Sequence, residues 1–142
     1  MNPKTVNTRQ ELLDNLDHGE CLTLLQNHAY VGRVAFVDDG HQRIFPVNYL
    51  ADDSGIIFGT SRGTVIDKLV DGTKVGFEVD GSHPLDHSGW SVTAEGTVHD
   101  VVDATELEML RRGPLKPWAR RVPERWVRIT IEELTGRRIP EH

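Results

Sequence analysis

The sequence has little cysteine, no long apolar run and no excess of positive charge. Its single cysteine, Cys21, excludes an internal disulfide and a cysteine-based zinc cluster, and suits a reducing compartment. No apolar run approaches the length of a membrane span, and the first residues do not form a signal peptide. A net charge of -6 over 142 residues argues against general nucleic-acid binding. We therefore expect one soluble, cytoplasmic domain over residues 1–142, with neither nucleic acid nor a membrane as partner.

No residue pattern indicates a metal site or a catalytic nucleophile. His83 and His87 have a spacing that would suit a metal ion on a helix, but Pro84 and the polar residues around it favour a solvated loop. The thiol of Cys21 has no basic neighbour close in sequence that would activate it. We expect no metal and no hydrolase chemistry.

The spacing of apolar residues predicts a mainly β protein with short helices. A capping box at 8–11 opens a helix that Gly19 ends, and a second box at 103–106 opens a helix that ends at Gly113. A third, short helix is expected near 64–70. Strands are predicted at 21–26, 30–37, 43–50, 56–60, 74–80, 90–102 and 126–131, with polar or irregular loops at 81–88 and 114–123. Because hairpins rather than helices join most strands, we expect an antiparallel barrel and not a doubly wound α/β fold.

The stretch 57–69 carries the strongest functional signal. A β-rich run ends in Thr60, Ser61, Arg62 and Gly63 and then passes into apolar residues at helical spacing, with Lys68 among them. Such a strand-to-helix junction gathers hydroxyl donors, free helix N-terminal N–H groups and positive charge, all of which suit a phosphate. The alternative is an ordinary Thr-Ser helix cap followed by solvated basic side chains.

Three further segments are candidates for a ligand site. Pro46 stands inside a predicted strand and requires an edge or a bulge, where free backbone groups could bind a flat heterocycle; the alternative is an edge strand that proline protects from aggregation. Trp90, after Ser88 and Gly89, could stack on a planar ligand or simply pack in the core. Trp118 lies in an irregular segment beside two arginines, which favours a ligand lid or a dimer contact.

Six short motifs occur in order along the chain: VGRVAF (31–36), PVNY (46–49), FGT-x-x-GT (58–64), VGFEVD (75–80), SGWSV (88–92) and LTGRR (134–138). Their order and spacing resemble those of the pyridoxamine 5'-phosphate oxidase-like family of FMN-binding split barrels. The resemblance is to its actinobacterial and nitroimidazole-reductase-like branch and covers about 22–139. The resemblance implies a homodimer of antiparallel split β-barrels with FMN bound at the subunit interface.

The resemblance also implies which residues bind the cofactor. In the family, the strand matching Pro46 to Tyr49 lies along the isoalloxazine ring, residues matching Thr60, Ser61 and Lys68 hold the phosphate, and the segment matching Ser88 to Trp90 reaches the flavin from the other subunit. The full set of expected cofactor-binding residues is Pro46, Val47, Asn48, Tyr49, Thr60, Ser61, Arg62, Lys68, Leu69, Ser88, Gly89, Trp90 and Trp118.

We therefore expect an FMN-dependent oxidoreductase acting on a small-molecule substrate. Gly59 stands where nitroimidazole-reductase-like members often carry histidine, and Trp126 to Arg128 match the substrate-phosphate pattern of pyridoxamine phosphate oxidases only in part. Neither of those two activities is therefore expected. The alternatives are a reductase of the same fold that uses the deazaflavin F420, and a non-catalytic flavin- or haem-binding protein.

Overall fold

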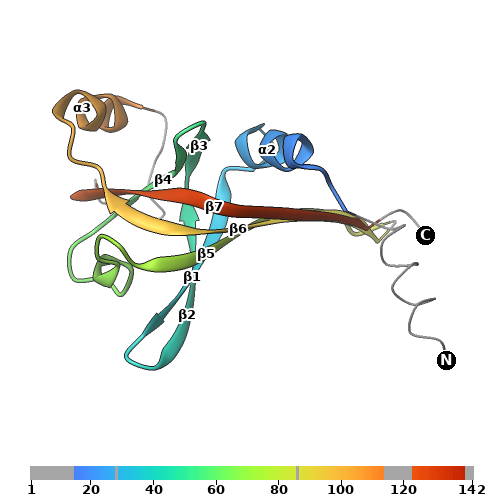
Figure 1. Ribbon diagram of the computed structural model, residues 1–142, viewed down its shortest axis with the longest axis horizontal. Coiled ribbons are helices and arrows are strands. Elements are labelled where there is room, and N and C mark those ends of the chain that lie inside the picture. The colour runs from blue at the N-terminus through green and yellow to red at the C-terminus, as the bar shows by residue number, and fades with distance from the viewer. Residues whose placement is uncertain (1–14, 28, 86, 114–122, 140–142) are drawn as a thin grey trace.

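The computed structural model describes residues 15–27, 29–85, 87–113 and 123–139. Within these residues, two α-helices, a single 3-10 turn and seven strands follow one another in sequence (Figure 1). In order they are α2 (His18–Asn27), β1 (Val31–Asp38), β2 (His41–Asn48), β3 (Leu50–Asp52), β4 (Gly55–Thr60), the 3-10 turn (Ile66–Lys68), β5 (Lys74–His83), β6 (Ser88–Asp100), α3 (Ala104–Arg112) and β7 (Arg125–Ile139). No helix among these described residues is long and apolar enough to cross a membrane.

All seven strands belong to one antiparallel sheet with the order β2-β1-β5-β6-β7-β4-β3. The sheet curves strongly on itself, and the hairpin of β1 and β2 turns away from the long strands β5, β6 and β7 (Figure 1). It remains open, because β2 at one end of the order and β3 at the other are not paired with each other. The prediction of a mainly β, antiparallel barrel-like fold is therefore confirmed.

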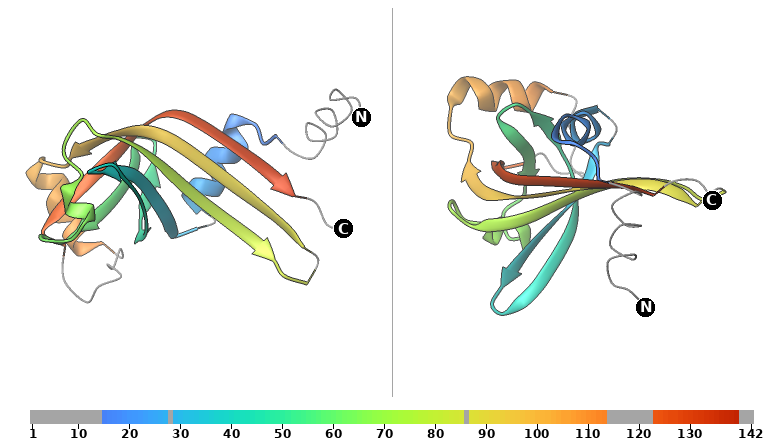
Figure 2. Two further views of the ribbon diagram at one scale, coloured as in Figure 1. Left: turned by 90° about the horizontal axis from the view of Figure 1, so that it is seen from below. Right: turned by 45° about the vertical axis from the view of Figure 1, so that its right-hand side comes forward.

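The core lies on the concave side of the sheet. Alternate residues of each strand point inward, as a strand requires, and bury side chains such as Val34 of β1, Phe77 of β5 and Val92 of β6. Helix α2 covers part of this core from the β3 side (Figure 2). A second, smaller cluster, in which Trp126 of β7 packs with residues of β4 and α3, lies on the other side of β7.

The segment predicted as a strand at 21–26 is helical, and this prediction was wrong. Asp17 and Glu20 form a capping box: the Asp17 carboxylate accepts from the Glu20 N–H at 2.8 Å, and the Glu20 carboxylate from the Asp17 N–H at 3.3 Å. Cys21, Leu24 and Leu25 then occupy the buried face of α2 at helical spacing. Gly19 was expected to end a helix over 8–19, of which residues 8–14 lie outside the described part, but Gly19 stands in the first turn of α2.

Most of the other elements agree with the sequence apart from their bounds. The predicted strand 43–50 is divided, because β2 ends at Asn48 and β3 begins at Leu50. Strand β5 continues to His83 and β6 begins at Ser88, so residues 81–83 and 88 of the loop expected at 81–88 belong to the β5–β6 ladder. The turn between β1 and β2 is the predicted hairpin, with positive φ at Asp39 and Gly40. Helix α3 has the predicted cap, in which Asp103 accepts from the Glu106 N–H.

Candidate functional site

The loop after β4 approaches the tip of the β1–β2 hairpin. The expected helix near 64–70 is only one 3-10 turn, Ile66–Lys68. Most backbone N–H groups around it are already bonded within the loop; those of Asp67 and Lys68, for example, donate to carbonyls three residues earlier. The helix N-terminus and dipole therefore offer little to an anion, and side-chain cations must provide the attraction.

Two cations meet at one carboxylate beside this turn. The ammonium Nζ of Lys68 lies 3.3 Å from Oδ2 of Asp38, and the guanidinium Nε of Arg43 lies 3.8 Å from the same oxygen. The Nε atom of Arg43 is buried and has no hydrogen-bond partner among the described residues. Lys68 itself is 61% exposed, so its ammonium group can change partner. This arrangement fits an anion that would supply the oxygen atoms that Asp38 alone cannot provide.

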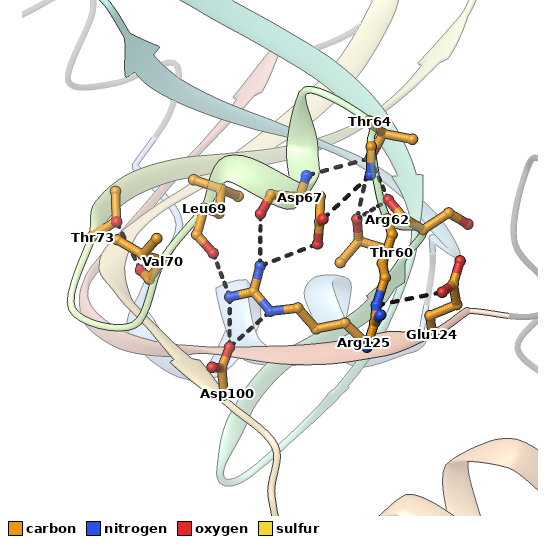
Figure 3. Close-up of polar contacts among 12 residues, drawn as sticks. Thr60, Arg62, Thr64, Asp67, Leu69, Val70, Thr73, Asp100, Glu124 and Arg125 are labelled. Atoms are coloured by element: carbon orange, nitrogen blue, oxygen red, sulfur yellow. Dashed lines mark hydrogen bonds and ion pairs between the residues drawn. The ribbon is translucent and has the colours of Figure 1, made fainter.

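The hydroxyl groups of Thr60 and Thr64 are held by bonds to each other and to the backbone of the loop. Thr60, at the end of β4, is buried, with its hydroxyl 3.4 Å from that of Thr64. Thr64 donates to the carbonyl oxygen of Ser61 at 2.8 Å, which closes a tight turn through Gly63 at φ +82°. Arg62 points away from this turn and is 80% exposed, with Glu124 3.5 Å from its guanidinium (Figure 3).

Arg125, the first residue of β7, was not indicated by the sequence, yet it forms several contacts with this loop. Its guanidinium donates to the backbone carbonyls of Asp67, at 3.0 Å, and of Leu69 (Figure 3). The carboxylate of Asp100 accepts from its Nε at 2.9 Å and from its Nη2 at 2.5 Å. Leu69 was expected to bind the cofactor, but its side chain is buried in the core. Its backbone carbonyl accepts a hydrogen bond from Arg125.

Strand β2 carries the next group of predicted residues and forms an edge of the sheet. Pro46 pairs with Arg33 of β1 on one side, and no strand of the described chain pairs with β2 on the other. The expectation that the proline marks an edge strand is confirmed. Val47 is buried. Tyr49 follows β2 and is committed to the core, because its hydroxyl donates to the carbonyl of Leu25 at 2.6 Å and burial raises the pKa of the phenol.

The third group, Ser88, Gly89 and Trp90, lies at the start of β6. These residues line a cleft of about 650 Å³ together with residues at the ends of β5 and β7, including Arg137 and Arg138. The indole of Trp90 covers its cross-strand partner Gly81, where an added Cβ would lie 2.7 Å from the indole Nε1. Trp90 also packs against the edge of the main core.

Trp90 and the cationic loop lie at opposite ends of β6. Asp100, which Arg125 contacts, ends this strand, and Trp90 stands near its beginning. Ten residues of strand separate the two, or about 33 Å along the strand. Figure 2 shows the ends of β5, β6 and β7 extending together beyond the other strands of the sheet. One chain therefore does not bring all the predicted residues together. Trp118 lies outside the described residues.

The same cleft contains an acidic pair that sequence reasoning did not single out. Glu78 and Asp80 of β5 share the guanidinium Nη1 of Arg33, at 3.1 Å each. Burial raises the pKa of Glu78 to about 7, the hydrogen bond and charge of Asp80 add to the rise, and Arg33 opposes it. His83 and His87, the two histidines whose spacing was considered for a metal ion, lie at the end of β5 and in the turn after it. No group of three or more metal-ligating side chains occurs among the described residues.

The open antiparallel barrel is a fold that this chain shares with a known family. The family model for pyridoxamine 5'-phosphate oxidase matches residues 17–138, and the chain belongs to this family of split barrels, as the six motifs indicated.

Individual relatives are similar over most of their length. The uncharacterized protein Rv0080 of Mycobacterium tuberculosis is 32% identical over 129 residues, which cover 87% of this chain and 84% of Rv0080. The solved structure of a FAD-binding protein of Mycobacterium smegmatis is 30% identical, with a TM-score of 0.73 over 89% of this chain and 97% of that one. A conserved protein of unknown function from Corynebacterium diphtheriae is 31% identical, with a TM-score of 0.70 over 89% and 97%.

Proposed function

We propose that this protein binds a flavin nucleotide, with FMN the expected cofactor, and acts as a flavin-dependent oxidoreductase on a small molecule in the cytoplasm. The observation that carries the proposal is the meeting of Lys68 and Arg43 at the Asp38 carboxylate. A phosphate carries more charge and more acceptor oxygens than one carboxylate, so it would satisfy both cations better. The hydroxyl of Thr64 already donates to the Ser61 carbonyl, so in this proposal the two cations provide the main attraction for the phosphate.

The edge of β2 suits the flavin ring. Arg43 and Pro46 stand three residues apart on this strand, about 10 Å along it, so a flavin lying along the edge of β2 would have its phosphate near Arg43 and its ring near Pro46. Unpaired backbone N–H and C=O groups on the outer side of β2 would hydrogen-bond the polar edge of the ring. When bound, the flavin supplies hydride or electron transfer, and the residues of the chain bind and orient it and limit its contact with water.

A homodimer completes the site in this proposal. Trp90 stands too far along β6 from the cationic loop to reach the same FMN, so the Ser88–Trp90 segment would act on the flavin of the partner subunit. Exposed apolar side chains on the outer face of β1 and β2, Val37 at 67% and Ile44 at 65%, support an interface there. A two-fold contact would also cover the unpaired edge of β2.

FAD is the second candidate cofactor. The M. smegmatis protein named as FAD-binding is 30% identical to this chain and matches nearly all of its length. FAD contains the same riboflavin 5'-phosphate group as FMN, so Lys68 and Arg43 would hold it in the same way, and the two cofactors differ only in what lies beyond that phosphate.

Mass spectrometry of the small molecule released from the purified protein tests the proposal. Release of FMN or FAD supports flavin binding and decides between them, whereas release of F420, of haem or of neither flavin overturns it. Turnover of NADH or NADPH with a dye acceptor then tests the oxidoreductase activity. Protein that holds flavin but transfers no electrons would be a flavin store or sensor.

A further inference from the structure

Arg125 holds the backbone on both sides of Lys68. Its two terminal nitrogens donate to the carbonyl oxygens of Asp67 and Leu69, the residues directly before and after Lys68. These carbonyls belong to the end of the 3-10 turn, where backbone acceptors lack partners within the turn itself. The planar guanidinium presents its donors in a rigid fork and reaches both acceptors at once, whereas the donors of an ammonium group all belong to one nitrogen on a flexible stem.

The guanidinium is itself fixed from the other side. Asp100, the last residue of β6, accepts two of its hydrogen bonds, and the Asp67 carboxylate lies 3.6 Å from Nη1. The side chain of Arg125 is only 22% exposed. Its charge is thus balanced by two carboxylates, and its function is to join β6 and β7 to the turn.

The turn depends on such external support. A single 3-10 turn of three residues is too short to be stable alone, because nucleating a helical turn costs more than its first hydrogen bonds return. The ammonium group of Lys68 reaches Asp38 on the hairpin, the carboxylate that Arg43 also approaches, only if this turn keeps its position.

We propose that Arg125 is a positioning residue of the anion site, which clamps the turn so that Lys68 lies beside Arg43 where the flavin phosphate binds. This inference rests on the proposed function. It assigns Arg125 no contact with the cofactor.

Strand β7 offers a matched control. Arg128 stands three residues further on, and its side chain is 21% exposed. It is also tied by an ion pair, to Glu106, and by a hydrogen bond of 3.0 Å to Ser54 Oγ. These partners lie in α3 and the β3–β4 turn, away from the Lys68 turn. Arg128→Lys therefore removes a similar set of contacts without releasing the turn.

The test compares the binding of FMN with that of riboflavin, which lacks the phosphate, in wild type, Arg125→Lys and Arg128→Lys. The lysine keeps the positive charge, so charge loss does not contribute. We expect Arg125→Lys to weaken FMN binding about tenfold, the size of one charge-assisted contact, and riboflavin binding less than about twofold. Arg128→Lys should change neither by more than about twofold. Equal FMN affinities for the two variants, or equal losses for FMN and riboflavin, would overturn the inference.

Two further measurements make the outcome independent of folding defects and of flavin. In a Lys68→Ala background, Arg125→Lys should weaken FMN binding little further, since it acts through Lys68; fully additive losses would contradict this. In cofactor-free protein, the amides of Asp67 to Leu69 should exchange with deuterium faster in Arg125→Lys than in Arg128→Lys. If Arg125→Lys does not fold, Asp100→Asn, which loosens the guanidinium, should give the same pattern at smaller size, and its absence would overturn the inference.

The binding measurements distinguish failure of the proposed flavin nucleotide site from failure of the positioning role of Arg125. A wild-type protein that binds riboflavin as tightly as FMN has no phosphate site, and both proposals fail. If Lys68→Ala weakens FMN binding and Arg125→Lys does not, the phosphate site stands and only the positioning role of Arg125 is wrong.

Discussion

Lys68 and Asp38 connect two segments far apart in the sequence, the turn after β4 and the tip of the β1–β2 hairpin, through an ion pair of 3.3 Å. Arg43 approaches the same oxygen of Asp38 at 3.8 Å. One carboxylate thus holds two cations. A bound phosphate would compete with Asp38 for both, and the cations would move little to accept it.

The first prediction concerns the phosphate contact. We expect Lys68→Ala to weaken FMN binding by about 1.5–3 kcal/mol, or one to two decades in affinity, because it removes a charge-assisted hydrogen bond. Arg62→Ala is the comparison, since Arg62 is 80% exposed and lies beside Glu124 rather than Asp38. It should reduce the affinity less. Isothermal titration measures both, and an unchanged affinity for Lys68→Ala would remove this residue from the site.

The second prediction concerns the dimer. Sedimentation equilibrium should show a homodimer at micromolar concentration, and Ile44→Glu should dissociate it by placing a charge in the interface. An unpaired buried charge costs about 3 kcal/mol or more, which is roughly a hundredfold in the dissociation constant. Flavin should be lost together with the dimer.

Val102→Glu is the control for this substitution. Val102 is also apolar and 80% exposed, but it lies just before α3 rather than on the outer face of β1 and β2. Its variant should remain dimeric and flavin-bound. A stable, flavin-loaded wild-type monomer, or equal dissociation by both variants, would contradict the proposed interface.

The third prediction follows from Glu78. The pKa of its carboxyl is raised from 4.5 to about 7 in the folded protein, by burial first and then by Asp80. At a pH between these two pKa values, the Glu78 carboxyl keeps its proton in the folded protein and loses it in the unfolded chain. The free energy of unfolding should therefore fall as the pH rises through this window. Glu78→Gln should remove this part of the decline, as measured by urea unfolding at intervals from about pH 4.5 to 7.

Glu132→Gln provides the contrast. Hydrogen bonds from Lys74 and Thr97 lower the pKa of Glu132, so its contribution is present at higher pH and is lost only as the pH falls below the window. The decline from about pH 4.5 to 7 should persist in this variant. If Glu78→Gln shows the same decline as the wild type, the shift at Glu78 is not what sets the pH dependence.

Local patterns in the sequence predicted much of the fold. Alternation along β1 and β6, the Asp39-Gly40 turn and the Asp103 cap depend on neighbours within a few residues, and all appear in the structure. Helix α2 was mistaken for a strand because its short apolar run fits the periodicity of a helix as well as that of a strand. The capping box of Asp17 and Glu20, with Cys21 and Leu24 three residues apart, was the available signal for a helix.

The candidate site could be predicted only in part, since its geometry is tertiary. The hydroxyls and Lys68 were found because they are close together in the sequence. Arg43 and Arg125 were not, because their contacts depend on the tertiary fold. Arg43 shares the Asp38 carboxylate with Lys68 only because the hairpin approaches the turn after β4. Arg125 bonds to the carbonyl of Leu69, a residue 56 positions away in the sequence. The strand-to-helix interpretation overestimated the helix, because a single 3-10 turn gives the same apolar spacing over so few residues.

The last prediction tests where the flavin ring lies relative to the tryptophans. An indole in contact with a flavin quenches the flavin's own fluorescence, whereas energy transfer from a distant indole does not, so flavin emission reports contact. Trp90→Phe should therefore raise the emission of bound FMN, since we place Trp90 against the ring of the partner's flavin. Trp118→Phe should do the same if Trp118 borders the site as its sequence context predicts. Trp126→Phe should leave the emission unchanged, because Trp126 is 3% exposed and packs between β4, β7 and α3. Affinity for FMN is measured in parallel, so that emission from released flavin is subtracted. A rise confined to Trp126→Phe would place the ring at the α3 side of β7 and would contradict the site proposed along β2.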